Sequence, residues 1–248
     1  RLSARAPGIA WRVGAEVGMR VRRGDVLALV DAAEVGRAKA EFLQALAMSG
    51  SKARLLTRLH AALEEGKHLV QIKTRQFERV KNAAQENLVA QAGIQDAEAA
   101  LAEVQLQALQ MQVELEESEA ALREGRIRLF NAQQTLTNLG LPVKLEDTRD
   151  LPDDKLAEKL RLLGLPDSII KDLDPGAVTA NLLPIVAPFD GVVVFRDVVA
   201  GEVLDTSKPL FVVADVSRMW IMLNIRQEDA LALAVGQKIL FRPDGNAL

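Results

Sequence analysis

Residues 187–204 read APFDGVVVFRDVVAGEVL, a pattern of apolar runs and glycine turns that is typical of short β-strands. Residues 6–21 read APGIAWRVGAEVGMRV and have nearly the same layout. In each stretch two glycines lie ten residues apart, and the second glycine precedes a leucine by nine residues. We interpret the two stretches as quasi-equivalent halves of one small β-sandwich, although most of the chain separates them.

Four glycines mark the expected corners of this sandwich. Glycine adopts positive φ angles without strain and lets two backbones approach closely, and tight turns between strands require one or the other. The four predicted turn glycines are Gly18, Gly24, Gly191 and Gly201.

The layout resembles the biotinyl/lipoyl carrier fold, whose two halves are related by a pseudo-twofold axis. In carriers the halves meet at a tight turn that bears the modified lysine, and here residues from about 31 to 184 replace that turn. Lys208 lies at a different corner, so a carrier function loses its attachment residue. We therefore expect no cofactor, and a lipoyl- or biotin-carrying subunit remains the less favoured alternative.

The second of two predicted helical arms carries the clearest periodicity of the chain. Apolar or small residues hold two positions of each heptad from residue 94 to residue 139 with no charge among them, which predicts a coiled-coil seam. One position is held by Ile94, Leu101, Ala108, Leu115, Leu122, Leu129 and Leu136, and the other by Ala97, Val104, Met111, Ser118, Gly125, Ala132 and Leu139.

The first arm is predicted to begin at Asp31, an N-cap that forms a capping box with Glu34. One heptad position of this arm is mostly apolar, and a companion position four residues further on is weaker. The first position comprises Phe42, Ser49, Leu56, Leu63, Val70, Phe77 and Ala84, and the companion comprises Leu46, Ala53, His60, Lys67, Thr74, Lys81 and Leu88.

The two arms have nearly equal lengths on either side of residues 86–92, which predicts an antiparallel hairpin with its tip there. Each arm would extend about 70–80 Å at a rise of about 1.5 Å per residue. Small residues at 49–50 and at Gly125 should then face each other and allow close contact. A helical bundle whose arms bend back on themselves is the alternative.

The predicted fold class is α+β: a long antiparallel coiled-coil hairpin inserted between the halves of a lipoyl-like β-sandwich, followed by part of a β-barrel domain. The expected segments are 1–31 and 185–216 for the sandwich, 32–140 for the hairpin, 141–184 for a helical shoulder and 217–248 for the start of the barrel. Within the last segment we expect a strand at 219–225, a short helix at 228–235 and a strand at 238–241. The rest of the barrel would lie in parts absent from this chain.

The composition argues against several functional classes. The 248 residues are 49% hydrophobic and carry a formal net charge of −3 with both signs mixed, so we expect no nucleic-acid partner. The chain has no cysteine, which excludes disulfides but leaves periplasm and cytoplasm both open. There is no apolar run of 18 residues and no HExxH, GxxxxGK or GxGxxG motif, so we expect neither a membrane span nor an enzyme.

His60, Glu64 and His68 are the only weak candidates for a metal site. They lie four residues apart and so share one stripe of the first arm. The outer two are about 12 Å apart along the helix axis, so only neighbouring members could share a metal ion. Two ligands make a poor site, and we interpret the stripe as a solvated helix face.

In this order the segments resemble the periplasmic adaptor family, also called membrane fusion proteins, of tripartite efflux and secretion machines. The resemblance rests on GAEVGMRVRRGDVLALVD (14–31) and VAPFDGVVVFRDVVAGEVLDTSKPLFVVADVSRMWIMLNI (186–225) around the hairpin, and on EDALALAVGQKI (228–239). The stretches KLRLLGLPDSII and TANLLPIVAPFDG look most like the heavy-metal or cation branch that serves RND-type pumps.

The resemblance implies a periplasmic protein that links an inner-membrane efflux pump to an outer-membrane channel and assembles as a ring or funnel of several copies. Association with the inner membrane would use parts absent from this chain. The exported cargo would be a metal, another cation or a drug, and the adaptor itself performs no bond chemistry. The adaptor of an ABC-type exporter or a type I secretion system shares every module seen here and remains an alternative.

In many members of this family the hairpin tip presents an arginine, a leucine and a serine to the channel. The nearest candidates here are Arg79, Leu88 and Gln91, although their spacing differs and Gln91 replaces the small hydroxyl. The expected channel contacts are Arg79, Asn82, Glu86, Asn87, Leu88 and Gln91.

Overall fold

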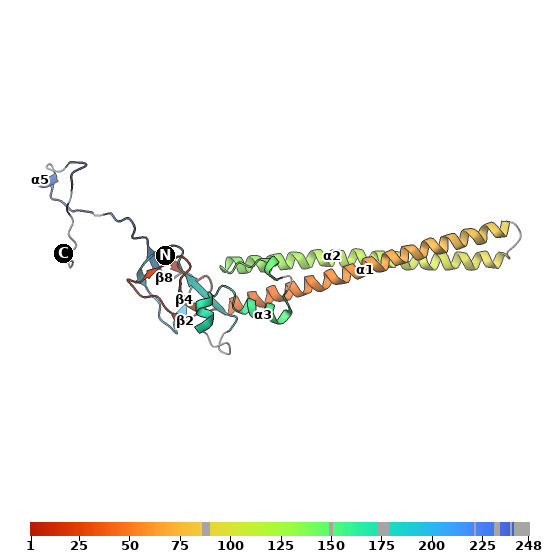
Figure 1. Cartoon of the computed structure of the whole chain (residues 1–248), viewed down its shortest axis with the longest axis horizontal. Coiled ribbons are helices and arrows are strands. Elements are labelled where there is room, and N and C mark those ends of the chain that lie inside the picture. Colours follow the sequence, from red (N-terminus) through yellow and green to blue (C-terminus); the bar gives the residue numbers. More distant parts are fainter. Residues whose placement is uncertain are drawn as a thin grey trace.

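The computed structural model describes residues 1–85, 90–148, 151–172, 179–220, 222–230, 234–238 and 240. A long helical hairpin extends from a small β-sandwich, and a short helix packs beside the base of the hairpin (Figure 1). The elements are β1 (Leu2–Ser3), β2 (Gly8–Val13), β3 (Arg20–Val21), β4 (Val26–Asp31), α1 (Ala33–Gln85), α2 (Gln91–Asn138), the 3-10 helix η1 (Leu145–Thr148), α3 (Asp153–Arg161), α4 (Asp167–Asp172), β5 (Leu182–Val186), β6 (Gly191–Arg196), β7 (Val203–Leu204), β8 (Pro209–Ala214) and α5 (Gln227–Ala230).

The sandwich consists of two four-stranded sheets with the strand orders β1-β8-β6-β3 and β5-β4-β2-β7. Each sheet combines strands from before and after the hairpin. Strand β4 pairs with β5, β2 with β7, β1 with β8 and β3 with β6, all antiparallel. The two sequence halves therefore interleave in one body, which confirms the predicted split sandwich.

Backbone hydrogen bonds relate the two halves at a constant offset of 183 residues. The amide of Gly18 donates to the carbonyl of Val193 at 2.8 Å, and the amide of Gly201 donates to the carbonyl of Ala10 at 2.7 Å. Both glycines have positive φ angles, 90° and 86°. The β2/β4 and β6/β8 pairs also share a register irregularity at equivalent places. This pseudo-twofold relation explains why the two stretches of sequence look alike.

The other two predicted turn glycines have different roles. Gly24 has a φ angle of 92° in the turn between β3 and β4. Gly191 is the first residue of strand β6, and of the two properties expected of a corner glycine it has close backbone approach and not a positive φ angle. A Cβ atom at Gly191 would overlap the carbonyl oxygen of Ala214 in β8, and one at Gly8 would overlap that of Asp31 in β4. Gly191 is therefore needed for close strand approach.

Helix α1 begins at Ala33, directly after strand β4. Asp31 is the last residue of that strand and pairs with Ile9 on one side and Leu182 on the other. The prediction that Asp31 is the N-cap is therefore wrong, because pairing on both edges keeps Asp31 in the sheet and leaves Ala32 before the helix.

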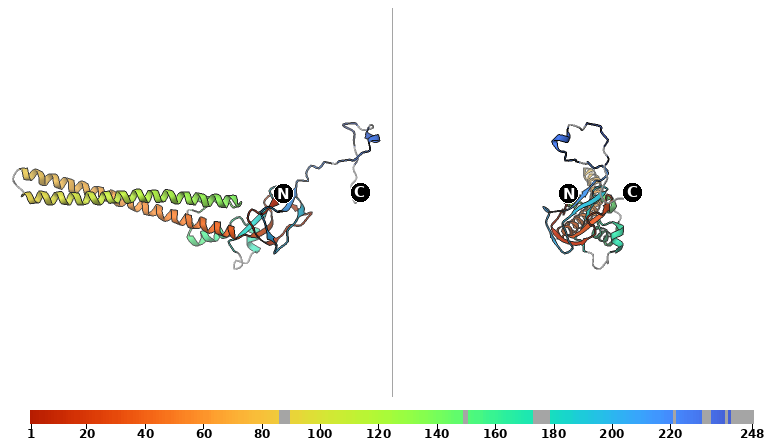
Figure 2. Two further views of the ribbon diagram at one scale, coloured as in Figure 1. Left: turned by 180° about the vertical axis from the view of Figure 1, so that it is seen from behind. Right: turned by 90° about the vertical axis from the view of Figure 1, so that its left-hand side faces the viewer.

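Helices α1 and α2 have 53 and 48 residues and form a straight antiparallel rod (Figures 1 and 2). Their lengths correspond to about 70–80 Å. Every predicted seam position of α2 is buried or half-buried. A Cβ atom at Gly125 would lie 3.8 Å from the Cα atom of Ser49, so the small residues face each other as predicted. The alternative of a bent bundle is wrong.

In the outer half of α1, the second seam position lies three residues after the first, instead of four as predicted. The half-buried residues at this position are Leu59, Gly66, Lys73 and Val80. The exposed residues of the predicted companion set are His60, Lys67 and Lys81. The α2 seam also advances by three and then four residues, and two helices packed as a coiled coil must share that spacing.

The hydrophobic core of the sandwich continues into the base of the hairpin. Phe42 of α1 and Leu136 of α2 are fully buried. They belong to one cluster with Val193 and Phe211 of the sandwich and with Leu160 of α3. Because these side chains pack together, the direction of the rod is tied to the sandwich.

The described residues after β8 contain α5 and no strand. The strand predicted at 219–225 is therefore wrong, and Trp220 and Met222 are 97% and 92% exposed. A strand needs a paired neighbour for its backbone amides and carbonyls, and none of the described residues supplies one. Of the predicted helix 228–235, residues up to Ala230 lie in α5, and Phe241 lies outside the described residues. The assignment of 217–248 to a β-barrel domain stays a prediction.

Candidate docking surfaces of the hairpin

The far end of the rod carries three of the six predicted channel contacts in the described part of the chain. Arg79 and Asn82 lie in the last two turns of α1, and Gln91 is the first residue of α2; all three are exposed. Glu86, Asn87 and Leu88 lie outside the described residues. The described tip residues are thus at the end of the rod opposite the sandwich (Figure 1).

The structure does not bring the three weak metal candidates together. His60 Nε2 lies 3.8 Å from Glu119 Oε1 on α2. Glu64 instead accepts a hydrogen bond from Lys67 at 2.8 Å, and this bond is the main reason that the pKa of Glu64 is lowered. Within the described ranges, no group of three His, Cys, Asp or Glu side chains could hold a metal ion.

Lys208, the lysine considered for a carrier role, is held at a corner of the sandwich. Its Nζ atom donates to Glu202 at 2.8 Å and lies 3.3 Å from Asp197 Oδ2. The hydrogen bond to Glu202 is the main cause of the raised pKa of Lys208. The ammonium group therefore connects the end of β6 with the start of β7, two strands that belong to different sheets, which is a structural role.

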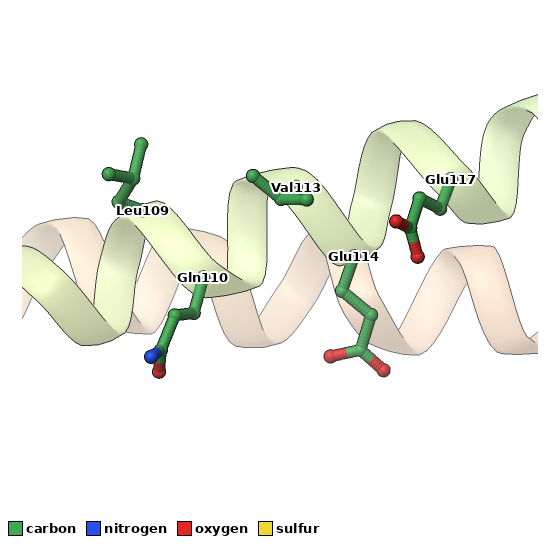
Figure 3. Close-up of a pocket in the computed structure, with 5 residues that line it drawn as sticks. All are labelled: Leu109, Gln110, Val113, Glu114 and Glu117. Atoms are coloured by element: carbon green, nitrogen blue, oxygen red, sulfur yellow. The ribbon is translucent and has the colours of Figure 1, made fainter.

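Helix α2 has a second apolar stripe on its outer face, away from the seam. The exposed residues of this stripe are Leu106, Leu109, Val113, Ile127 and Phe130. Figure 3 shows Leu109 and Val113 on the side of α2 turned away from α1, with Glu114 and Glu117 beside them. These residues line a shallow hollow of about 350 Å³. Exposed apolar stripes of this kind mark contact surfaces for other proteins.

Helix α1 carries a matching but weaker outer stripe of Met48, Leu55, Leu69 and Ile72. Gly66 packs near the Sδ atom of Met111, so Leu69 and Ile72 lie at nearly the same level of the rod as Leu106 of α2. Neither stripe was predicted from the sequence. Their three- and four-residue spacing beside the seam was the signal that could have identified them.

A buried lysine connects the base of the rod to the shoulder. Lys39 of α1 is 2% exposed, and its Nζ atom donates to the carbonyl of Arg161 in α3 at 3.1 Å. Burial lowers the pKa of Lys39 from 10.5 to about 8, because the charged form loses its water. By its spacing, Lys39 occupies a predicted seam position of α1, but it is not apolar. The sequence alone therefore did not predict that Lys39 is buried.

Lys39 should make the protein more stable as the pH rises from about 8 to 10.5. In this window the unfolded chain binds more protons than the folded protein, so raising the pH favours folding. The full effect corresponds to about 3 kcal/mol at about 1.36 kcal/mol per pKa unit. Urea denaturation at several pH values measures it, and Cys or Tyr titration cannot interfere because the chain has neither residue.

Lys39→Met should flatten this pH dependence, whereas the control Lys155→Met, at an exposed position of α3, should retain it. Equal slopes for wild type and Lys39→Met between pH 8 and 10.5 would show that Lys39 does not cause the effect.

A small β-sandwich split by a long coiled-coil hairpin, with candidate docking surfaces at the tip and on the outer faces of the rod, is the architecture that the family comparison addresses. The sequence model of the family described as "CzcB-like, barrel-sandwich hybrid domain" matches residues 1–215. The chain therefore belongs to this family, which confirms the resemblance to periplasmic adaptors. No curated protein sequence matches the chain.

Several solved structures are similar to this chain. The periplasmic adaptor protein EmrA is 18% identical, with 86% of this chain and 71% of that chain covered and a TM-score of 0.35. ZneB from Cupriavidus metallidurans is 16% identical, with 88% and 60% covered and a TM-score of 0.35. LipC, a membrane fusion protein of a type I secretion system, is 15% identical, with 86% and 98% covered and a TM-score of 0.29. The chain thus spans 60% of the ZneB chain.

Proposed function

We propose that this protein is the adaptor of a tripartite export machine, in which the hairpin spans the distance between an inner-membrane pump and an outer-membrane channel. The observation that supports this most directly is the rod itself: two straight helices of 53 and 48 residues that rise from one sandwich. A spacer must keep a constant length and a constant direction. The coiled-coil seam keeps the length of the rod constant, and the continuous core at its base fixes its direction relative to the sandwich.

We favour a pump of the RND type that exports metals, other cations or drugs, with the adaptor located in the periplasm. The CzcB-like family assignment and the resemblance of the shoulder sequence to the metal branch support this choice. Residues 217–248 would begin the barrel domain nearer the pump and the inner membrane. Co-purification of the full-length protein from membranes tests the proposal, because an ABC-type exporter or a type I secretion pump in place of an RND pump would contradict it.

We propose that the rod of one copy of this chain packs against the rods of further copies in a homo-oligomer. When two copies stand side by side in the same orientation, the α2 stripe of one can lie against the α1 stripe of the next. Leu106 and Leu109 would then meet Leu69 and Ile72, which lie at nearly the same level of the rod. Such a contact is heterologous, and repeated contacts of this type form a ring or funnel when the rotation between successive copies closes.

Charge reversal at the tip should abolish binding to the channel. We expect Arg79→Glu combined with Leu88→Glu to lower the recovery of channel in a pull-down at least tenfold, because the change removes a cation and an apolar contact and adds two negative charges. Association with the pump should be unchanged, since the sandwich lies at the other end of the rod (Figure 1).

The matched control is Arg37→Glu, which reverses an exposed charge near the first turn of α1 and should leave channel recovery unchanged. Normal channel recovery by the Arg79→Glu, Leu88→Glu variant would remove the tip from the channel-binding site.

A further inference from the structure

A cavity of about 950 Å³ lies at the base of the rod. Three parts of the chain line it: the basal half of α1, the basal half of α2, and the shoulder from η1 to α3. The two arms lie further apart toward the sandwich than toward the tip (Figures 1 and 2). The volume falls within the range of sites that enclose small organic ligands, roughly 300–1,000 Å³.

The floor of this cavity is aliphatic. Leu122 and Leu129 of α2 and Leu156 of α3 are buried there, and Leu43 and Leu46 of α1 are half-buried. An aliphatic chain placed on this floor would be removed from contact with water along most of its length. Each buried methylene group should raise the affinity roughly fourfold.

Among the described residues that line the cavity, the charged ones are two arginines, and none of them is a carboxylate. Arg54 comes from α1 and Arg126 from α2, so each arm contributes one arginine to the lining. Neither has an acidic residue three or four positions away on its own helix. In the described part of the chain, neither makes a hydrogen bond or ion pair, whereas Arg123 and Arg128 each pair with a glutamate of α2.

The two unpaired arginines also lie at similar levels of the rod. Gly125 packs against Ser49, and His60 lies next to Glu119. In the sequence, Arg54 lies between Ser49 and His60 on α1, and Arg126 directly follows Gly125 on α2. A single anion at the cavity mouth can therefore interact with guanidinium groups from both arms, and guanidinium matches the geometry of a carboxylate well.

We propose that the cavity binds a free fatty acid, with its carboxylate at Arg54 and Arg126 and its chain on the leucine floor. Charge complementarity selects an anionic head group, and the aliphatic floor selects a hydrocarbon tail. The site is separate from the tip and shares only Phe130 with the outer stripe of α2. A bound fatty acid would fill the space between the arms and stiffen the base of the rod.

Fluorescence titration of the full chain with 11-(dansylamino)undecanoic acid tests this site. We expect saturable binding of one probe per chain, displaced by decanoate at concentrations at least tenfold lower than by decanol. Displacement by the two competitors at equal concentrations would show that the carboxylate is not recognised and would overturn the proposal.

Variants locate the binding site. Arg54→Gln combined with Arg126→Gln should weaken probe binding at least tenfold, and Ala47→Trp, at an exposed position on the cavity edge, should block it. The matched control is Arg58→Gln combined with Arg123→Gln, which removes the same charge from the same two arms outside the cavity. If the control pair weakened probe binding equally, the arginines would act only through non-specific attraction of the anionic probe, and the proposal would be overturned.

Circular dichroism melting of each variant separates loss of binding from loss of folding, because both double variants change exposed side chains and should melt like the wild type. Two further results would contradict a free fatty acid as the occupant. One is competition by vesicles of anionic phospholipid but not by decanoate, which would indicate a membrane lipid. The other is probe release that accompanies self-association, which would indicate that a second copy covers the cavity.

Discussion

Replacing Phe42 by alanine should lower the free energy of unfolding by about 3–5 kcal/mol, the usual cost of emptying a fully buried phenylalanine site. The Phe42 side chain is 0% exposed and lies in the core cluster that joins the sandwich, the rod and the shoulder. The surrounding elements come from three directions and cannot collapse into the space without moving the rod. We therefore expect a loss near the upper end of this range.

The measurement is urea denaturation followed by two signals in a Trp220→Phe background. Far-ultraviolet circular dichroism reports the rod, and Trp11 of β2 reports the sandwich. Both transitions should shift together, because the core is continuous. The control Phe77→Ala removes the same side chain from a half-buried position near the tip and should cost less than half as much. A decrease in the free energy of unfolding of less than about 1 kcal/mol for Phe42→Ala would show that this core cluster does not hold the sandwich, the rod and the shoulder together.

Removing one matched heptad from each arm should abolish export while the protein still folds. The paired segments are 57–63 of α1 and 114–120 of α2, which lie opposite each other because Gly66 packs near Met111 and His60 lies next to Glu119. The deletion preserves the seam spacing but shortens the rod by about 10 Å, at about 1.5 Å for each of seven residues. If the hairpin is a spacer, the tip no longer reaches the channel.

The measurements are channel pull-down and export of a pump substrate by the full-length protein, with helicity and melting as checks of folding. Duplicating 64–70 together with 107–113 in the shortened protein should restore the length and rescue both activities. Deleting 57–63 alone should instead disrupt the seam register and lower the melting temperature. Normal export by the shortened but folded protein would mean that rod length is not what the machine requires.

Local repeats made the main architecture predictable. The paired glycine intervals of the two β stretches reflect hydrogen bonds between equivalent residues, such as those of Gly18 and Gly201. The α2 seam was predictable at every position, because a two-helix coiled coil imposes a heptad spacing on both partners. The candidate tip residues came from the resemblance and stay a prediction, and three of the six lie among the described residues.

The remaining features depended on contacts between distant segments. At the base of the first helix, Ala45 and Leu46 are both apolar, so the residues three and four positions after Phe42 do not distinguish the two spacings. Contact with α2 places Leu59 and Gly66 in the seam and leaves His60 and Lys67 exposed. Asp31 stays in the sheet because strands on both edges hold it. The predicted strand at 219–225 has suitable residues but no neighbour to pair with among the described residues.

The repeated spacings in the chain were enough to predict strands β2 to β4 and β6 to β8, the course of the long helices and the joining of the two β halves, but not β1 or the start of β5 at Leu182, inside the predicted shoulder segment. These properties follow from spacings of two, seven and ten residues, which backbone geometry sets locally. Only the tertiary structure decided that Lys39 is buried, that the outer stripes are uncovered and that Arg54 and Arg126 border one cavity. Burial and charge pairing depend on which distant segments pack against a side chain, and no local spacing encodes that.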